Sequence, residues 1–223
     1  MAKDKGPLAY RTVLHGGSAE IVVKKSRFIA HIAPAESEEE AMAFIEGIRK
    51  KYWDARHNCH AFCVGLSPEM SRCSDDGEPP QTAGKPMLDV LTGQGLKNTV
   101  CVVTRYFGGT LLGTGGLVRA YAGAVQEGLA ASTIIEKKRC RQFRIATDYT
   151  MIGKLQYLAA QMDLMIMNTD YAESVVMTIL AEEEKVPAFL KKVTELGSGM
   201  IVPEETGFCY GARTDEGIQV FEF

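Results

Sequence analysis

The hydrophobic positions in the first quarter of the chain recur first with the period of a strand and then with that of a helix. Alternation predicts three short strands, at residues 10–14, 19–24 and 27–32. Ser37-Glu38-Glu39-Glu40 then fits a capping box, and the apolar positions from Ala41 onward share one helical face. The start of the chain therefore predicts three strands and an amphipathic helix.

The middle of the chain repeats this change of period. Strands are predicted at residues 57–66, 70–73 and 98–106, and helices near residues 86–91 and from about 115 to 131. The strand at 98–106 is apolar at consecutive positions, which is typical of a strand buried on both faces. A turn-rich loop at residues 74–84 precedes the shorter helix.

The last part of the chain has a compact alternation of its own. The pattern predicts a strand at 141–148, a helix at 150–163, strands at 164–170 and 173–181, a helix at 184–196 and a strand at 200–210. This β-α-β-β-α-β order is the ferredoxin-like unit. We therefore predict an α+β protein of two domains, residues 1–135 and 136–223.

A basic run lies at the predicted boundary. Lys137, Lys138, Arg139 and Arg141 fall within or beside residues 133–141. We interpret this segment as a solvated edge strand or an interdomain linker, with a polyanion-binding patch as the alternative.

Composition and charge limit the classes of partner. The 223 residues are 46% hydrophobic and 24% charged, which is ordinary for a globular protein. The net charge of −3 divides into +3 for residues 1–140 and −6 for the remainder, so a polyanion contact is expected only in the first part. The six cysteines form no CxxC pair, no apolar run matches a bilayer, and the first residues show no signal segment. We expect a cytoplasmic protein with reduced thiols and no membrane partner.

A glycine-rich loop is the most informative segment. Residues 108–116 hold five glycines between the apolar strand and the long helix, and Arg105 and Arg119 bracket them. Backbone N–H groups at a helix start bind phosphate or carboxylate, although the spacing matches neither a Walker loop nor a dinucleotide fingerprint. The alternative is a tight turn whose glycines only permit positive φ or close packing. The predicted anion-binding residues are Lys85, Arg105, Gly108, Gly109, Gly113, Gly115, Gly116 and Arg119. We expect the Arg105 side chain to leave its strand at the loop mouth, so that Arg105→Ala keeps the fold and loses binding.

Two further segments carry reactive side chains. In the strand from His57 to Cys63, alternation puts His57 and Cys59 on one face, too few ligands for a zinc site without help from elsewhere. We interpret it as a packed strand whose first residue, His57, contacts a ligand. The turn from Asp75 to Glu78 concentrates three carboxylates, which could hold Mg²⁺ against a bound phosphate or act as acid or base; a solvated turn is the alternative. The catalytic candidates are His57, Asp75, Asp76 and Glu78. No resident metal or cofactor is predicted beyond Mg²⁺ accompanying a phosphate.

Three segments together resemble the IMPACT/YigZ family. They are Arg56-His57-Asn58-Cys59-His60-Ala61, Ser74-Asp75-Asp76-Gly77-Glu78-Pro79 followed by Thr82-Ala83-Gly84-Lys85-Pro86, and Thr104-Arg105-Tyr106-Phe107-Gly108-Gly109 through Leu112-Gly113. The resemblance covers about residues 8–132, and the ferredoxin-like tail is similar to the C-terminal domain of bacterial members. It implies that the first domain has the fold of the second domain of a small-subunit ribosomal protein, which part of elongation factor G and the galactokinase–mevalonate kinase group share. The resemblance implies a functional surface made of residues from all three segments. These residues are His57, Asp75, Asp76, Glu78, Thr82, Gly84, Arg105, Gly108, Gly109 and Gly113.

The resemblance implies a role in translation. Eukaryotic members regulate translation by competing for a scaffold that activates the starvation-response kinase, and they carry an additional N-terminal interaction domain that we expect this chain to lack. Our first hypothesis is a non-catalytic protein that binds RNA, the ribosome or a translation partner through the anion-binding loop. The second is an enzyme on a small phosphorylated substrate, with Mg²⁺ and His57 as general base. The sequence does not predict an oligomeric state.

Overall fold

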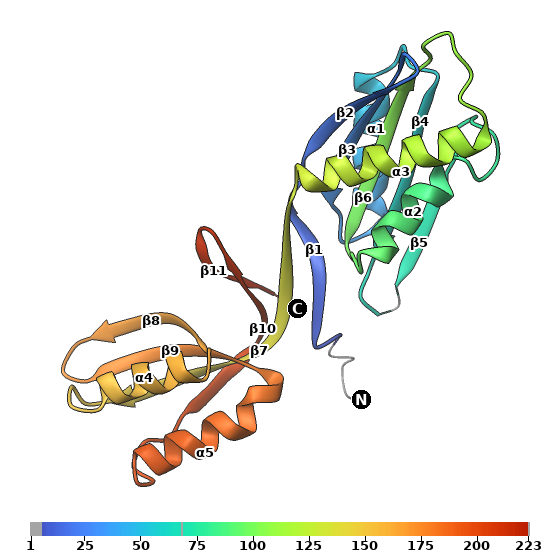
Figure 1. Ribbon diagram of the computed structural model, residues 1–223. Coiled ribbons are helices and arrows are strands. Elements are labelled where there is room, and N and C mark those ends of the chain that lie inside the picture. Colours follow the sequence, from blue (N-terminus) through green and yellow to red (C-terminus); the bar gives the residue numbers. More distant parts are fainter. Residues whose placement is uncertain (1–5, 68, 223) are drawn as a thin grey trace. The chain divides into compact units, whose positions relative to one another are not determined.

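The computed structural model describes residues 6–67 and 69–222, which form two compact units (Figure 1). One unit comprises residues 10–135, and the other joins residues 136–222 with residues 6–9. The units divide after residue 135, and residues 6–9 lie with the second unit. The reason is that the Leu8 carbonyl accepts a hydrogen bond from the Arg139 backbone N–H (2.8 Å) and the Pro7 carbonyl accepts one from the Tyr210 hydroxyl (2.8 Å).

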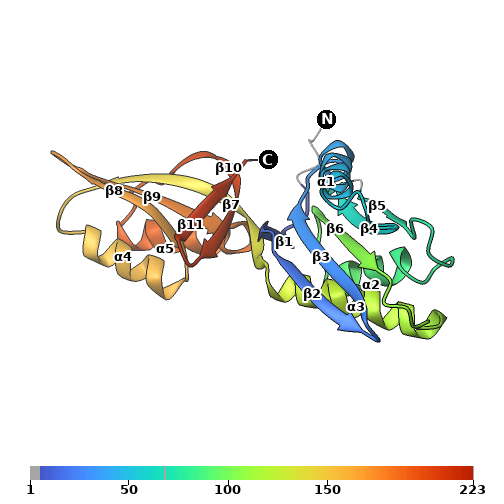
Figure 2. The same cartoon turned by 90° about the horizontal axis from the view of Figure 1, so that it is seen from above.

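The N-terminal unit is built on a five-stranded antiparallel sheet in the order β2-β3-β6-β4-β5. Its strands are β2 (Ser18–Val23), β3 (Ser26–Pro34), β4 (His57–Val64), β5 (Met70–Ser74) and β6 (Thr99–Tyr106). Its helices are α1 (Glu38–Lys51), α2 (Gly84–Gly93) and α3 (Thr114–Ala130). Helix α1 covers one face of the sheet, and α2 and α3 cover the other (Figure 2). The central strand β6 is therefore buried on both faces, as its apolar sequence predicts.

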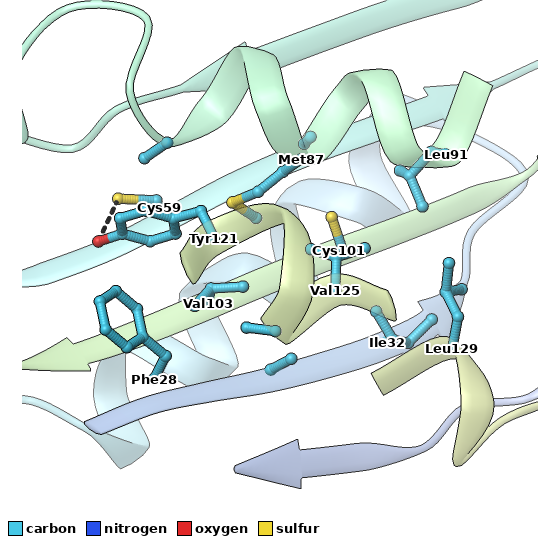
Figure 3. Packing of buried hydrophobic residues seen from close by; sticks show 14 of the residues in the cluster. Phe28, Ile32, Cys59, Met87, Leu91, Cys101, Val103, Tyr121, Val125 and Leu129 are labelled. Carbon is cyan, nitrogen blue, oxygen red and sulfur yellow. Dashed lines mark hydrogen bonds between the residues drawn. The ribbon is translucent and has the colours of Figure 1, made fainter. Parts of the chain in front are cut away.

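Strand alternation divides the core of this unit into two layers. On the side of α2 and α3, Cys59 and Phe28 pack with Met87, Val125 and their neighbours (Figure 3). Cys59 Sγ donates a hydrogen bond to the Tyr121 hydroxyl at 3.4 Å. The other face buries the next residues of the same strands against α1. The predicted division of the strand that begins at His57 into two faces is thus confirmed.

The C-terminal unit has the ferredoxin-like order of elements. These are β7 (Thr133–Thr147), α4 (Ile152–Gln161), β8 (Met165–Tyr171), β9 (Val175–Glu182), the short η1 (Glu183–Lys185), α5 (Val186–Leu196) and β10 (Glu204–Thr214). The strands pair antiparallel as β10-β7-β9-β8, and β11 (Gly217–Phe221), which the sequence did not predict, extends the sheet beyond β10. Strand β1 (Ala9–His15) also pairs with β7. The predicted α+β class is confirmed.

Residues 133–141 form the first part of β7 and contain the boundary between the two units, after residue 135. Within this segment, residues 138–141 pair with β10, and residues 140–141 also pair with β9. Its basic side chains meet carboxylates of the neighbouring segments: Arg141 Nη2 lies 2.5 Å from Glu183 Oε1, and Lys138 Nζ lies 3.3 Å from Glu182 Oε1. A basic run in the sequence does not show which acidic side chains will lie opposite it in the folded protein. Among the described helices, none is both long and apolar enough to span a lipid bilayer.

Candidate functional site

The acidic turn between β5 and α2 ties the N-terminal unit together through Asp75. Its carboxylate accepts hydrogen bonds from the backbone N–H groups of Gln81 (2.8 Å), Ala83 (2.9 Å) and Gly84 (2.9 Å). Burial raises the pKa of the Asp75 carboxyl, but these N–H groups outweigh burial and hold the pKa below its ordinary value. Asp75 therefore fastens the turn to the start of α2.

Asp76 fastens the same turn to β4. Its carboxylate accepts the Asn58 backbone N–H at 2.7 Å and pairs with Arg49 of α1 at 3.0 Å. Its carbonyl oxygen lies 2.9 Å from His57 Nδ1. A carbonyl oxygen only accepts, so Nδ1 carries the proton, and the neutral ring has its lone pair on Nε2.

Glu78 is buried inside the unit, where its carboxylate contacts one residue of strand β6 and one of helix α3. Its Oε1 is 2.6 Å from Arg105 Nη1, at the end of β6, and 2.8 Å from the Tyr121 hydroxyl, which α3 supplies. The Arg105 and Glu78 side chains are only 8% and 3% exposed. The expectation that Arg105→Ala keeps the fold conflicts with this burial, because an internal carboxylate retains the side chain.

A pocket of about 510 Å³ opens beside Arg105, at the end of the sheet where β4 begins and β6 finishes. The register places His57 directly opposite Arg105 across these strands. The lining residues are Asp54, Arg56, His57, Arg105, Tyr106, Phe107 and Leu111. Two smaller pockets, of about 220 and 210 Å³, lie in the C-terminal unit among charged side chains such as Glu182 and Lys138.

The pocket unites two predicted site residues with several that sequence reasoning missed. His57 and Arg105 line it as predicted contacts, whereas Asp54 and Leu111 were not singled out for binding. The Tyr106 hydroxyl donates to Asp54 Oδ1 at 2.8 Å. The sequence does place these residues beside the ends of two predicted strands. Because the pairing of those strands was not predicted, the sequence did not indicate that the residues share a pocket.

The glycines of the loop between β6 and α3 satisfy backbone requirements. A Cβ at Gly108 would lie 2.0 Å from the Lys25 carbonyl carbon, and the Gly108 N–H donates to Ser26 Oγ at 3.1 Å. Gly109 and Gly113 have φ of +82° and +73°. The tight-turn interpretation thus accounts for these three positions, and their contact with an anion stays a prediction.

The other predicted residues lie outside the pocket lining. Gly115, Gly116 and Arg119 belong to the first turns of α3, while Lys85 pairs with Asp89 along α2. Thr82 and Gly84 belong to the acidic turn. The Thr82 hydroxyl donates to the Pro79 carbonyl at 2.7 Å, and a Cβ at Gly84 would lie 2.7 Å from the Ser74 nitrogen.

The three carboxylates of the turn were predicted to hold Mg²⁺ or to act as acid or base, and all three have hydrogen-bond or ion-pair partners within the protein. Asp75, Asp76 and Glu78 accept the bonds described above, so their oxygens point to backbone, Arg49, Arg105 and Tyr121. Over residues 6–67 and 69–222, no group of three or more His, Cys, Asp or Glu side chains is placed to hold a metal ion. His57 is the catalytic candidate that lines the pocket.

Comparisons with known proteins cover both units. Residues 24–129 match the family model described as the Impact N-terminal domain, and residues 145–200 match one described as a domain of unknown function. The chain is 43% identical to IMPACT family member YvyE of Bacillus subtilis over 191 residues, which is 86% of this chain and 88% of that one. It is 39% identical to IMPACT family member YigZ of Escherichia coli over 181 residues, 80% of this chain and 89% of the relative. A crystal structure described as a hypothetical protein is 35% identical, covers 90% of this chain and 98% of its own, and has a TM-score of 0.58.

Proposed function

Since the chain belongs to the IMPACT family, we propose that it is a cytoplasmic regulator of translation that binds RNA, the ribosome or a translation partner through its N-terminal unit. The pocket at the end of the sheet carries this proposal. It combines the guanidinium groups of Arg56 and Arg105 with the exposed ring of Phe107. Cations beside an exposed aromatic ring suit a ligand that carries both an anionic group and a planar one, as a nucleotide of RNA does with its phosphate and its base.

Additional basic residues support binding at this end of the sheet. Lys24 and Lys25 form the turn that precedes β3, whose first residues pair with the end of β6. Lys50 and Lys51 close α1, a short loop before β4 begins. All four are exposed. These lysines concentrate positive charge at this end of the sheet, although residues 1–140 carry a net charge of only +3.

The proposal is tested by sedimentation with ribosomes and by binding to labelled RNA. We expect binding that weakens between about 50 and 200 mM salt, because phosphate contacts release counterions. The double variant K24E/K25E should bind less, while K191E/K192E on α5, also at exposed or half-exposed lysines, serves as the matched control. If neither ribosomes nor RNA bind and added protein leaves translation in a cell extract unchanged, the proposal is overturned.

The enzyme hypothesis retains one supporting observation. His57 lines the pocket opposite Arg105, and its Nδ1–H is engaged by Asp76, which leaves Nε2 as the basic atom of the neutral ring. In that case His57 removes a proton from a substrate whose phosphate meets Arg56 and the glycine loop, with Mg²⁺ as its counterion. Turnover of a phosphorylated metabolite that is lost in His57→Gln, with ribosome binding unchanged, would favour this candidate.

A further inference from the structure

Arg105 has hydrogen-bonding capacity beyond its ion pair. Nη1 meets Glu78, but Nε is buried and has no hydrogen-bond partner in the described part of the chain. Guanidinium carries five N–H donors, and an unpaired buried donor is costly. Arg105 also lines the pocket, so its guanidinium charge attracts an anionic group that enters there.

The guanidinium of Arg105 also lies close to two aromatic rings. Its carbon is 5.4 Å from the centre of the Phe28 ring and 5.7 Å from that of Phe107. Phe28 is fully buried, whereas Phe107 is 55% exposed. Phe107 thus presents, beside the guanidinium, a ring that is open to solvent and to a further planar group.

The remaining walls offer contacts that suit a nucleoside. Leu111, 82% exposed, supplies an apolar wall from the glycine loop, and Arg56 supplies an exposed cation. His57 Nε2 and the Asp54 carboxylate are acceptors for the N–H groups of a base. The volume of about 510 Å³ lies within the range of about 300–1,000 Å³ found for small-ligand sites.

We infer that this pocket binds a single nucleotide, with the base against Phe107 and the phosphate at Arg56 and Arg105. The same chemistry is present in a free mononucleotide and in one unpaired nucleotide of single-stranded RNA. The inference rests on the proposed function, since it gives the pocket-bearing end of the sheet a specific ligand chemistry.

The probes are labelled hexauridylate and hexaadenylate for fluorescence anisotropy, and AMP and UMP for calorimetry, all with the full chain. Phe107→Ala should lower affinity by about tenfold, the size of a lost base–aromatic stack, and Phe107→Tyr should restore it. Tyr157→Ala, which removes an exposed ring from α4, is the matched control. Circular dichroism checks that each variant is folded, which we expect because Phe107 is exposed.

Arg56→Gln tests the phosphate contact. It should weaken oligonucleotide binding and lower the slope of log affinity against log salt by about one. Arg72→Gln is the control, because Arg72 is also exposed but lies on β5 and pairs with Glu38 at the start of α1.

Each result has a defined meaning. Hexamers that bind while AMP and UMP do not identify RNA as the source, whereas mononucleotides that displace the hexamers identify free nucleotide; both support the inference. Absence of binding by every probe, or binding that Phe107→Ala leaves unchanged, overturns it. Because the regulatory role is read separately in a translating extract, the inference can fail while the proposed function holds, and the reverse.

Discussion

Arg105 and Glu78 form a buried ion pair, 2.6 Å between Nη1 and Oε1, that joins the end of β6 to the acidic turn before α2. Tyr121 of α3 donates to the same carboxylate oxygen. One face of this arrangement is a wall of the pocket, and the other is the core. The pocket-lining side chain of Arg105 is thus held by the folding of three separate elements.

The ion pair makes Glu78→Ala strongly destabilising. Removal of one partner leaves the Arg105 charge buried and unpaired, which costs about 3–5 kcal/mol in the free energy of unfolding. Urea denaturation measures it. Glu20→Ala is the control, because Glu20 forms an exposed pair with Arg27 that solvent screens, so its loss should have a much smaller effect. Similar losses in the two variants would contradict this role of the buried pair.

Arg105→Ala is expected to destabilise the protein as well, in contrast to what the sequence indicated. It leaves the Glu78 carboxylate buried with Tyr121 as its remaining partner, and we expect a similar loss of about 3–5 kcal/mol. Thermal unfolding followed by circular dichroism checks this. A variant as stable as the parent would show that the carboxylate is hydrated, and would restore Arg105 as a simple probe of binding.

Asp75 makes the stability of the protein depend on acid pH. Its folded pKa is lowered, so its contribution is complete above the unfolded value of about 3.9 and is lost as pH falls through the lower folded pKa. Asp75→Asn should therefore cost most near neutral pH, and its difference from the parent should shrink below about pH 3.9. Denaturation at several pH values measures this. Asp89→Asn, at an exposed helix position, should show a much smaller difference at neutral pH.

Replacement of a glycine by alanine should change the free energy of unfolding by an amount that depends on the surroundings of that glycine. Gly108→Ala places a Cβ 2.0 Å from the backbone of Lys25 and should cost more than about 4 kcal/mol. Gly109→Ala meets open space at φ of +82° and should cost about 1–2 kcal/mol. Gly47→Ala, within α1 and also in open space, should stabilise by up to about 1 kcal/mol. Equal effects at Gly108 and Gly109 would show that the loop moves away freely.

The six cysteines should differ sharply in reactivity. Cys73 is exposed, whereas Cys59, Cys63, Cys101, Cys140 and Cys209 are buried. Burial raises the pKa of the buried thiols, that of Cys140 to about 12, which keeps them protonated. Titration with a thiol reagent should find one reactive group in the folded protein and six after unfolding. Any fast-reacting thiol in folded Cys73→Ser would contradict the packing described here.

The candidate site was predictable only in part. His57 was predicted as a ligand contact because it begins a strand, and it lines the pocket. The carboxylates from Asp75 to Glu78 could have faced solvent, a metal or the protein, and nothing in their spacing distinguishes these. Their partners, Asn58, Arg105 and Tyr121, lie 18, 27 and 43 residues away along the chain.

The sequence by itself determined the elements and the α+β class, because hydrophobic period and turn residues act over a few neighbouring positions. It determined the order of the ferredoxin-like strands and the two faces of the strand from His57 for the same reason. Only the tertiary structure decided that β7 lies inside its sheet, that Arg105 is buried, and that His57 stands opposite it. These outcomes depend on strand pairing between segments that are distant in the sequence. That pairing decides which side chain lies close enough to neutralise a buried charge.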